Sequence, residues 1–182
     1  MAPHFVVVEG LTGSGKTSVA DRLAERVSLH RLPIVAEEYK GAFARVENDP
    51  ALLDSRYALF LSSVFATGER VRFLLAEGVG VAVDSWWYRT VATHVALGAG
   101  FQASIPAWLP APTLGVFLDL PEPVRQNRIA HRGRPSGYWK SRCEEHSEVI
   151  RDLYRAIAPD LVWVDARSSL DAVVTEVERL LR

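Results

Sequence analysis

The sequence contains little that would support an exported, membrane-bound or cysteine-dependent protein. Cys143 is the only cysteine among 182 residues, so neither an intrachain disulfide nor a zinc site built on several cysteines can form. No apolar run approaches the roughly 18 residues of a membrane-spanning helix, and no basic segment precedes the short apolar run near the amino terminus. These absences favour a reducing, cytoplasmic setting without a membrane partner.

The chain also lacks an excess of charge of either sign. Its 21 basic and 22 acidic residues leave a formal net charge of -1. Surfaces that bind nucleic-acid polymers or anionic membranes carry strong positive charge, so this balance argues against both and favours a small-molecule partner. Lysine is scarce, with only three in the chain, and one of them, Lys16, stands inside a glycine-rich loop.

Short apolar runs alternate with longer amphipathic stretches, which predicts a single α/β domain over residues 1–182. Continuous β-branched runs favour strands that are covered on both faces. The segment at 98–112, rich in glycine and proline, is predicted to be an irregular connection. The predicted strands are 4–9, 32–37, 79–84, 113–119 and 161–165, and the predicted helices are 16–29, about 50–76, 87–97, 122–131, 140–157 and 169–181.

Residues 10–17, GLTGSGKT, fit the phosphate-binding pattern G-x-x-x-x-G-K-[ST] between an apolar strand and an amphipathic helix. Its glycines let consecutive backbone N–H groups surround a phosphate. Lys16 is predicted to contact the β- and γ-phosphates of ATP, and Thr17 to offer its hydroxyl to Mg²⁺. A turn that merely happens to use glycine is the alternative, which the flanking strand and helix disfavour. The predicted nucleotide-binding residues are Gly10, Thr12, Gly13, Ser14, Gly15, Lys16, Thr17 and Ser18.

Acidic residues close four of the predicted strands, where doubly wound sheets collect their chemistry. Asp84 is the first choice for a catalytic carboxylate that holds Mg²⁺, with helix N-capping as the alternative. Glu37 or Glu38 is predicted to act as a base or acceptor ligand, with a solvated loop carboxylate as the alternative. Asp119 and Asp165 are interpreted as structural or adenine-side residues.

Arginines gather after the fourth strand. Arg125, Arg128 and Arg132 are spaced to share one helix face, and Arg134 follows in a loop. Arginines that close from a lid stabilise the charge that spreads over a phosphoryl group during transfer. We therefore predict a lid at about 128–142 with Arg128, Arg132 and Arg134 as catalytic residues; a solvated helix face is the alternative.

The order of these pieces resembles the thymidylate kinase and deoxynucleoside kinase group of P-loop kinases. FVVVEGLTGSGKTS is similar to that group's first strand and P-loop, and VFLDLPEPVRQNRIAHRGR to its fourth strand and lid helix. VAVDS matches the strand end that carries Asp-Arg or Glu-Arg in the group. This resemblance spans nearly the whole chain. It implies a five-stranded parallel sheet with helices on both faces, a short arginine-bearing lid, and a homodimer paired through the helix at 50–76.

Three departures from the group's pattern fall where the phosphate acceptor binds. Thr12 replaces an acid that lies near the acceptor's sugar, and Ser85 replaces the arginine that holds the acceptor's phosphate. An ungapped count places Val64 where thymidylate kinases have a further arginine. Either Arg89 or Arg70 has taken over the clamp, or the acceptor carries no phosphate there.

Large rings follow the catalytic strand end in the segment WWYR, residues 86–89. They are predicted to wall an acceptor pocket together with Phe60, which falls where the group stacks the acceptor base; core packing is the alternative. The predicted substrate-binding residues are Glu38, Tyr39, Phe60, Trp86, Trp87, Tyr88 and Arg89.

The sequence thus predicts an ATP- and Mg²⁺-dependent kinase of a small acceptor, most simply a nucleotide or nucleoside. A kinase of another hydroxyl-bearing metabolite stays open because of Thr12, Ser85 and Val64. A nucleotide-binding switch that phosphorylates no acceptor is the alternative from a different functional class.

Overall fold

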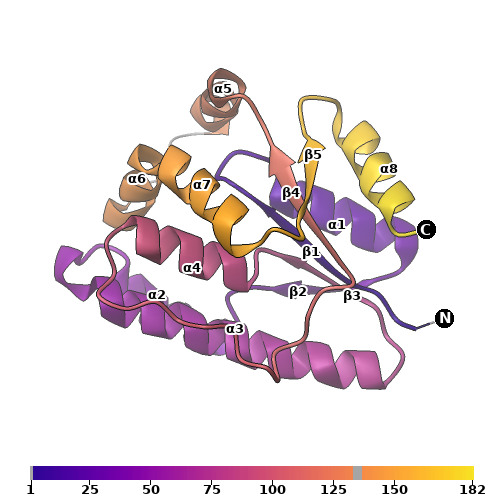
Figure 1. Cartoon of the computed structure of the whole chain (residues 1–182), viewed down its shortest axis with the longest axis horizontal. Helices are drawn as coiled ribbons and strands as arrows, with labels where there is room; N and C mark the ends of the chain where they lie inside the picture. The colour runs from indigo at the N-terminus through magenta and orange to yellow at the C-terminus, as the bar shows by residue number, and fades with distance from the viewer. Residues whose placement is uncertain (1, 133–136) are drawn as a thin grey trace.

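Five parallel strands form one sheet in the order β2-β3-β1-β4-β5, which confirms the predicted α/β class (Figure 1). The structure, a computed structural model, describes residues 2–132 and 137–182. Val7 of the central strand pairs with Val83 on one side and Gly115 on the other. The strands are β1 (Phe5–Gly10), β2 (His30–Pro33), β3 (Val81–Asp84), β4 (Leu114–Asp119) and β5 (Val162–Asp165).

The sheet is covered on both faces because the side chains of β1 alternate between two apolar layers. Phe5 and Val7 pack against α3 (Leu53–Ala76) and α4 (Trp87–Ala96). Val6 and Val8 pack against α1 (Lys16–Val27) and α8 (Leu170–Leu180) on the other face. Every residue of β1 is buried, as the continuous apolar run predicts.

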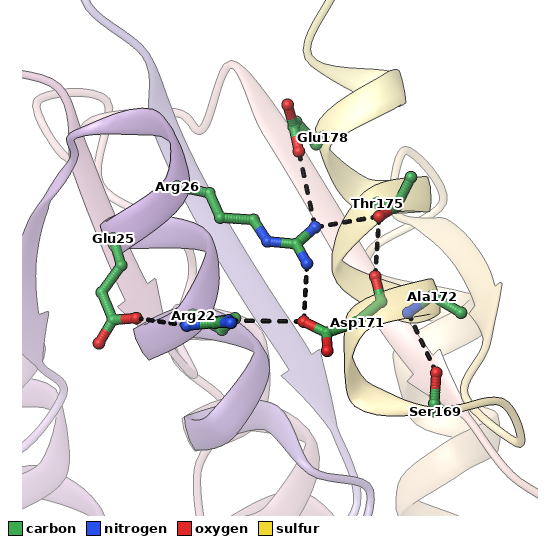
Figure 2. Close-up of polar contacts among 8 residues, drawn as sticks. All are labelled: Arg22, Glu25, Arg26, Ser169, Asp171, Ala172, Thr175 and Glu178. Atoms are coloured by element: carbon green, nitrogen blue, oxygen red, sulfur yellow. Dashed lines mark hydrogen bonds and ion pairs between the residues drawn. The ribbon is translucent and has the colours of Figure 1, made fainter.

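Helices α1 and α8 lie side by side and are joined by ion pairs as well as by apolar contact (Figure 2). Arg26 binds Asp171 at 2.6 Å, and Arg22 reaches the same oxygen at 3.5 Å. Exposed pairs of this kind contribute about 1 kcal/mol or less. The buried contact of Leu23 with Val174 and its neighbours therefore holds this layer more firmly than the charges do.

Strand β2 ends earlier than predicted, at Pro33, because α3 takes over the backbone groups that follow. Thr67 donates to the Pro33 carbonyl at 3.2 Å, and Ser63 donates to Ile34 O and accepts from Ala36 N. The chain then forms a short 3-10 turn (Glu37–Tyr39) and α2 (Lys40–Val46), neither of which the sequence pattern predicted.

The predicted helix at 140–157 is two helices, α6 (Tyr138–Glu145) and α7 (Ser147–Ile157), since the backbone at His146 leaves the helical region with φ -103° and ψ 17°. This break lets α7 turn Ile150 and Tyr154 into the core. Helix α5 (Glu122–Arg132) follows β4 as predicted, and the segment at 98–112 is irregular as predicted.

A short turn capped by an aspartate leads into the long helix α3, within the predicted range of about 50–76. Asp49 accepts a hydrogen bond from Ala51 N at 2.9 Å, and Pro50 opens a 3-10 turn (Pro50–Leu52) that leads into the helix. Pro suits such a first turn because its missing N–H has no helical partner there.

The end of β3 turns sharply beside the P-loop (residues 10–17). Ser85 has a positive φ of 77°, which is uncommon for a residue with a side chain. Its backbone N–H still bonds to Val8 O at 2.9 Å, and the turn sends Trp86 back against Phe5 in the core. The residues that close β1 and β3 therefore meet at one edge of the sheet.

Candidate active site

The P-loop forms a cradle of backbone amides at the start of α1. Gly10, Gly13 and Gly15 all have positive φ, and a Cβ on Gly13 would meet Ile129 Cγ1 at 2.8 Å. Only glycine fits such a position. Because α1 begins at Lys16, the free N–H groups of its first turn point at the loop, where an anion is stabilised. The cradle therefore fits a phosphate group.

Lys16 lies across this loop, and its Nζ donates to Leu11 O at 3.0 Å. Burial, assisted by the positive charge of Arg89, lowers the pKa of Lys16 to about 7. An anion placed in the cradle would restore the lysine's charge, so the loop is suited to receive negative charge.

Thr17 and Asp84 are brought together as predicted, since the Thr17 hydroxyl donates to Asp84 Oδ2 at 2.6 Å. Helix α4 starts without a side-chain cap, so Asp84 does not act as its N-cap. A hydroxyl and one carboxylate suit Mg²⁺, which prefers oxygen ligands and shares its shell with substrate phosphates. Within residues 2–132 and 137–182 no cluster of three or more metal-ligating side chains exists that would form an all-protein site instead.

Arg31 is a neighbour of this carboxylate that the sequence did not reveal. It reaches Asp84 Oδ1 at 2.5 Å and Asp21 at 2.8 Å, so it joins β2, β3 and α1. Arg31 therefore balances the charge of Asp84 and fixes one of its oxygens, while the other faces Thr17.

Glu9, the last side chain before the P-loop, is fully buried. It accepts hydrogen bonds from Trp86 N at 2.8 Å, from Arg89 N at 3.4 Å and from the Tyr154 hydroxyl at 2.8 Å. Burial raises the pKa of Glu9. In the sequence, the signal for this residue was an acid inside the apolar run FVVVEG. The hydrogen bonds of Glu9 connect β1 to α4 and α7.

A cavity of about 400 Å³ opens beside the P-loop between α3, α4 and α6; we call it the Arg89 cavity. Thr12 belongs both to the loop and to the cavity wall, so the two spaces adjoin. The lining residues are Thr12, Ile34, Glu47, Arg56, Phe60, Ser85, Arg89, Thr90, Thr93, His94, Lys140 and Cys143.

Arg89 points from α4 toward the P-loop. Its guanidinium donates to Gly10 O at 3.3 Å and to the Thr12 hydroxyl at 3.4 Å. Among the described residues no carboxylate forms an ion pair with it within 4.0 Å, although Glu9 and Glu144 lie close enough to interact with its charge. Arg70, the other candidate for the lost clamp, lies outside the cavity and pairs with Glu38 at 2.6 Å, and Val64 is buried in the core.

A second arginine, Arg56, also lines the Arg89 cavity and was missed by sequence reasoning. Its Nε donates to Glu47 Oε2 at 3.3 Å, and its Nη1 lies 2.7 Å from His94 Nε2. An arginine can only donate, so His94 Nε2 accepts and its Nδ1–H donates to Thr90 O at 2.7 Å. Burial and the nearby Arg56 lower the pKa of His94 to about 3, so its imidazole is neutral.

This buried histidine makes the protein sensitive to acid. Because the folded pKa is about 3 and the unfolded value about 6.5, the unfolded chain binds the proton first as pH falls below 6.5. We expect the free energy of unfolding of the wild type to drop by about 2 kcal/mol more than that of His94→Gln between pH 7 and pH 5. Urea unfolding at both pH values measures this. Equal losses in the two proteins would contradict a buried neutral His94.

The aromatic residues of WWYR do not line the Arg89 cavity. Trp86 packs edge-on against Phe5 with ring centroids 5.1 Å apart, and Trp87 stacks on Phe65 at 6.0 Å. Tyr88 is half-buried between two core clusters. The structure thus shows the core packing that was the alternative, because the turn at Ser85 directs these rings inward; of the predicted aromatics only Phe60 lines the cavity.

The predicted acceptor residues after β2 also lie elsewhere. Glu37 is 80% exposed and pairs with Lys40 at 2.5 Å. Glu38 is held by Arg70 on the outer surface, and Tyr39 is half-buried at the start of α2. The unpredicted short helices carry these side chains away, so none of the three lines the Arg89 cavity.

A smaller cavity of about 300 Å³ lies on the other side of the P-loop, against α8. Ser14, Gly15 and Ser18, three of the predicted nucleotide-binding residues, line it. Arg128 also lines it and donates to Ala166 O at 2.9 Å. Its place is therefore beside this cavity rather than in the Arg89 cavity.

Of the other arginines predicted in this segment, the structure describes the side chain of one, Arg125. Arg125 is buried and donates to Thr12 O at 2.8 Å while it pairs with Glu122 and Glu144. It thus ties α5 to the P-loop. The side chain of Arg132 and the whole of Arg134 lie outside the described part of the chain.

The chain has relatives among known proteins. No family model matches the chain. A probable thymidylate kinase of Pyrococcus horikoshii is 27% identical over 202 residues, covering 100% of this chain and 97% of the relative. The resemblance to the thymidylate kinase group is thereby confirmed.

Solved structures match over nearly the whole chain. A thymidylate kinase from Candida albicans has a TM-score of 0.78 at 15% identity, covering 99% of this chain and 91% of that one. A deoxyadenosine kinase from M. mycoides, solved with bound dATP, has a TM-score of 0.73 at 12% identity and covers 98% of both chains. The predicted P-loop kinase fold is confirmed. None of the helices in residues 2–132 and 137–182 has the length and apolar character needed to span a membrane.

Proposed function

We propose that this phosphotransferase, a divergent relative of the thymidylate kinases with the P-loop kinase fold, transfers the γ-phosphate of ATP to a nucleotide. One observation carries the proposal: Arg89 reaches the P-loop from inside the adjoining cavity, through Gly10 O and Thr12. A donor phosphate in the loop and an acceptor in the cavity would therefore meet at one guanidinium.

The charges of the Arg89 cavity favour an acceptor that already carries a phosphate. Arg56, Arg89 and Lys140 face a single carboxylate, Glu47, and His94 is neutral. Glu9 and Glu144 lie close enough to Arg89 to offset part of this positive charge, and a phosphate on the acceptor would balance more of it. A nucleotide is thus favoured over both a nucleoside and another hydroxyl compound.

The P-loop and the residues beside it have distinct roles in the proposed reaction. The backbone amides and Lys16 bind the phosphates of ATP, and Thr17 and Asp84 would hold the ion. Mg²⁺, when bound, neutralises charge on the phosphate oxygens. Arg89 fixes the acceptor's phosphate next to the loop, so that the two reacting groups are aligned, which is the largest requirement of phosphoryl transfer.

Release of ADP from Mg·ATP tests the proposal. The full-length protein is assayed with dTMP, other nucleoside monophosphates, nucleosides and unphosphorylated hydroxyl compounds. We expect ADP release to be accelerated by at least one monophosphate and by no unphosphorylated compound. Slow hydrolysis that no acceptor accelerates, or acceleration only by an unphosphorylated compound, would contradict the proposal.

Arg89→Gln should raise the KM for the monophosphate acceptor about 100-fold, because a charge-assisted contact with a phosphate is lost. The KM for ATP should change little. Steady-state kinetics of the variant measures both values. Arg70→Gln, which removes an arginine outside the cavity, is the matched control and should behave as the wild type. A larger effect on the KM for ATP than on the KM for the acceptor would place Arg89 on the donor instead.

A further inference from the structure

Asp84, the carboxylate assigned to the ion, is held in a ring of contacts that phosphate binding does not need. Arg31 Nη2 pairs with Asp84 Oδ1 at 2.5 Å, and Arg31 Nε pairs with Asp21 Oδ1 at 2.8 Å. Asp21 lies one helical turn after Thr17 on α1, and the Thr17 hydroxyl closes the ring on Asp84 Oδ2 at 2.6 Å. Both oxygens of Asp84 are therefore bonded by side chains of this protein.

The register of the sheet brings Arg31 to this carboxylate. Arg31 pairs with Ala82, and Pro33 pairs with Asp84, so the two charged side chains come from neighbouring strands close to their carboxyl ends. The Arg31 guanidinium also donates to the backbone oxygens of Leu32 and Ala82. Only 24% of the Arg31 side chain is exposed. These contacts keep its positive charge at Asp84 and not in solvent.

The charges around Asp84 oppose a divalent cation that arrives alone. Lys16 lies close enough to Asp84 for their charges to interact, but Glu9 offsets part of its charge. Asp21 is 54% exposed, so water screens it. Arg31 is therefore the cation that decides the balance at Asp84. The phosphates of a nucleotide would reverse this balance, because they add several negative charges beside the same carboxylate.

We infer that Arg31 is a positioning residue that keeps free divalent cations off Asp84, so that the ion enters the site together with the nucleotide phosphates. This inference rests on the proposed function, in which Thr17 and Asp84 hold the ion. Arg31 offsets the charge of the carboxylate and occupies its Oδ1. Oδ2 is then the oxygen that can exchange the Thr17 hydroxyl for an ion. The protein thereby discriminates between a free metal ion and a metal ion bound to ATP.

Binding of Mn²⁺ to the full chain without nucleotide tests this, followed by the electron paramagnetic resonance signal of the free ion. Mn²⁺ takes the same oxygen ligands as Mg²⁺. We expect the wild type to bind Mn²⁺ only in the millimolar range or more weakly. Arg31→Gln, which removes the charge but keeps a donor for Asp84, should raise this affinity about 10-fold or more. Equal affinities in the two proteins, or micromolar binding by the wild type, would overturn the inference.

Three further variants separate the charge of Arg31 from its structural contacts. Arg31→Lys keeps the positive charge, so its affinity for Mn²⁺ should stay within about threefold of the wild type. Adding Asp84→Asn to Arg31→Gln should abolish the gain, which locates the ion at this carboxylate. Arg22→Gln is the matched control, since Arg22 pairs with Asp171 between α1 and α8 (Figure 2), and it should bind Mn²⁺ as the wild type does. A gain in Arg31→Lys equal to that in Arg31→Gln, or a gain that survives Asp84→Asn, would overturn the inference.

Arg31→Met is the second variant if Arg31→Gln does not fold, because methionine keeps an unbranched apolar stem. The same rise in Mn²⁺ affinity is expected, and no rise would count against the role of Arg31. In the wild type, Mn²⁺ should tighten binding of a non-hydrolysable ATP analogue about 10-fold or more. No tightening would overturn the joint entry of ion and nucleotide.

Failure of this inference and failure of the proposed function give different results, because Mn²⁺ binding needs no acceptor and no turnover. A rise in Mn²⁺ affinity in Arg31→Gln, in a protein whose wild type forms no ADP with any acceptor, would refute the kinase and keep the role of Arg31. Acceptor-stimulated ADP formation with equal Mn²⁺ affinities in wild type and variant would do the reverse.

Discussion

Lys16→Ala should lower kcat/KM for the kinase reaction about 1,000-fold. Lys16 is the cation of the P-loop, and its Nζ donates to Leu11 O. During transfer, negative charge spreads over the phosphoryl oxygens, where a fixed cation in a poorly hydrated site has its largest effect. ADP release in the presence of the best acceptor measures the loss.

Lys40→Ala is the matched control for this variant. Lys40 is exposed and pairs with Glu37, so removing it should leave kcat/KM unchanged. A loss of less than about 10-fold in Lys16→Ala would mean that the loop amides and the metal carry the charge without the lysine. That result would contradict the assigned role of Lys16 and leave the fold assignment intact.

Arg125→Ala should lower the free energy of unfolding by about 3–5 kcal/mol, the cost of removing one partner from a buried charge network. Arg125 is only 1% exposed, and its guanidinium lies 2.6 Å from both Glu122 and Glu144. Without the arginine, the largely buried Glu144 keeps a charge with no cation beside it, and Thr12 O in the P-loop loses a donor. Urea unfolding measures the difference.

Arg179→Ala serves as the comparison, because Arg179 forms an exposed pair with Glu176 on α8. Its removal should cost about 0.5 kcal/mol or less. If both variants lost the same amount, the buried network around Arg125 would contribute no more than a surface ion pair. The tie between α5 and the P-loop would then have to come from apolar contacts such as Gly13 with Ile129.

The parts of the site that were predictable are marked by local patterns in the sequence. The P-loop is a run of eight residues in which the glycines, the lysine and the threonine each indicate a role in phosphate binding. The role of Asp84 was predicted from its position at the end of a buried strand. The sheet class and four of the five strands follow from continuous apolar runs, whereas β2 shares only Leu32 and Pro33 with its predicted range. Such local signals need no knowledge of long-range packing.

What could not be predicted depends on contacts between distant segments. Arg56, Glu47 and His94 come from α3, the end of α2 and α4, and nothing in the sequence indicates that they meet. The two tryptophans were predicted to wall a pocket because the effect of Ser85 was not visible. A positive φ at that residue reverses the chain and sends the rings into the core.

The hydrogen bonds of Glu9 affect how the P-loop is aligned with the helix that carries Arg89. One carboxylate with a two-carbon stem holds the last strand residue before the phosphate loop against the backbone of the helix that carries Arg89. In the proposed reaction, the length of this side chain therefore helps to set the separation between donor and acceptor, together with the pairing of β1 with β3. The same oxygen, Glu9 Oε1, accepts from both Trp86 N and Arg89 N, so a single atom fixes the start of α4 relative to the P-loop. A change in stem length would shift the two halves of the reaction relative to each other, even if every group that touches a substrate stayed in place.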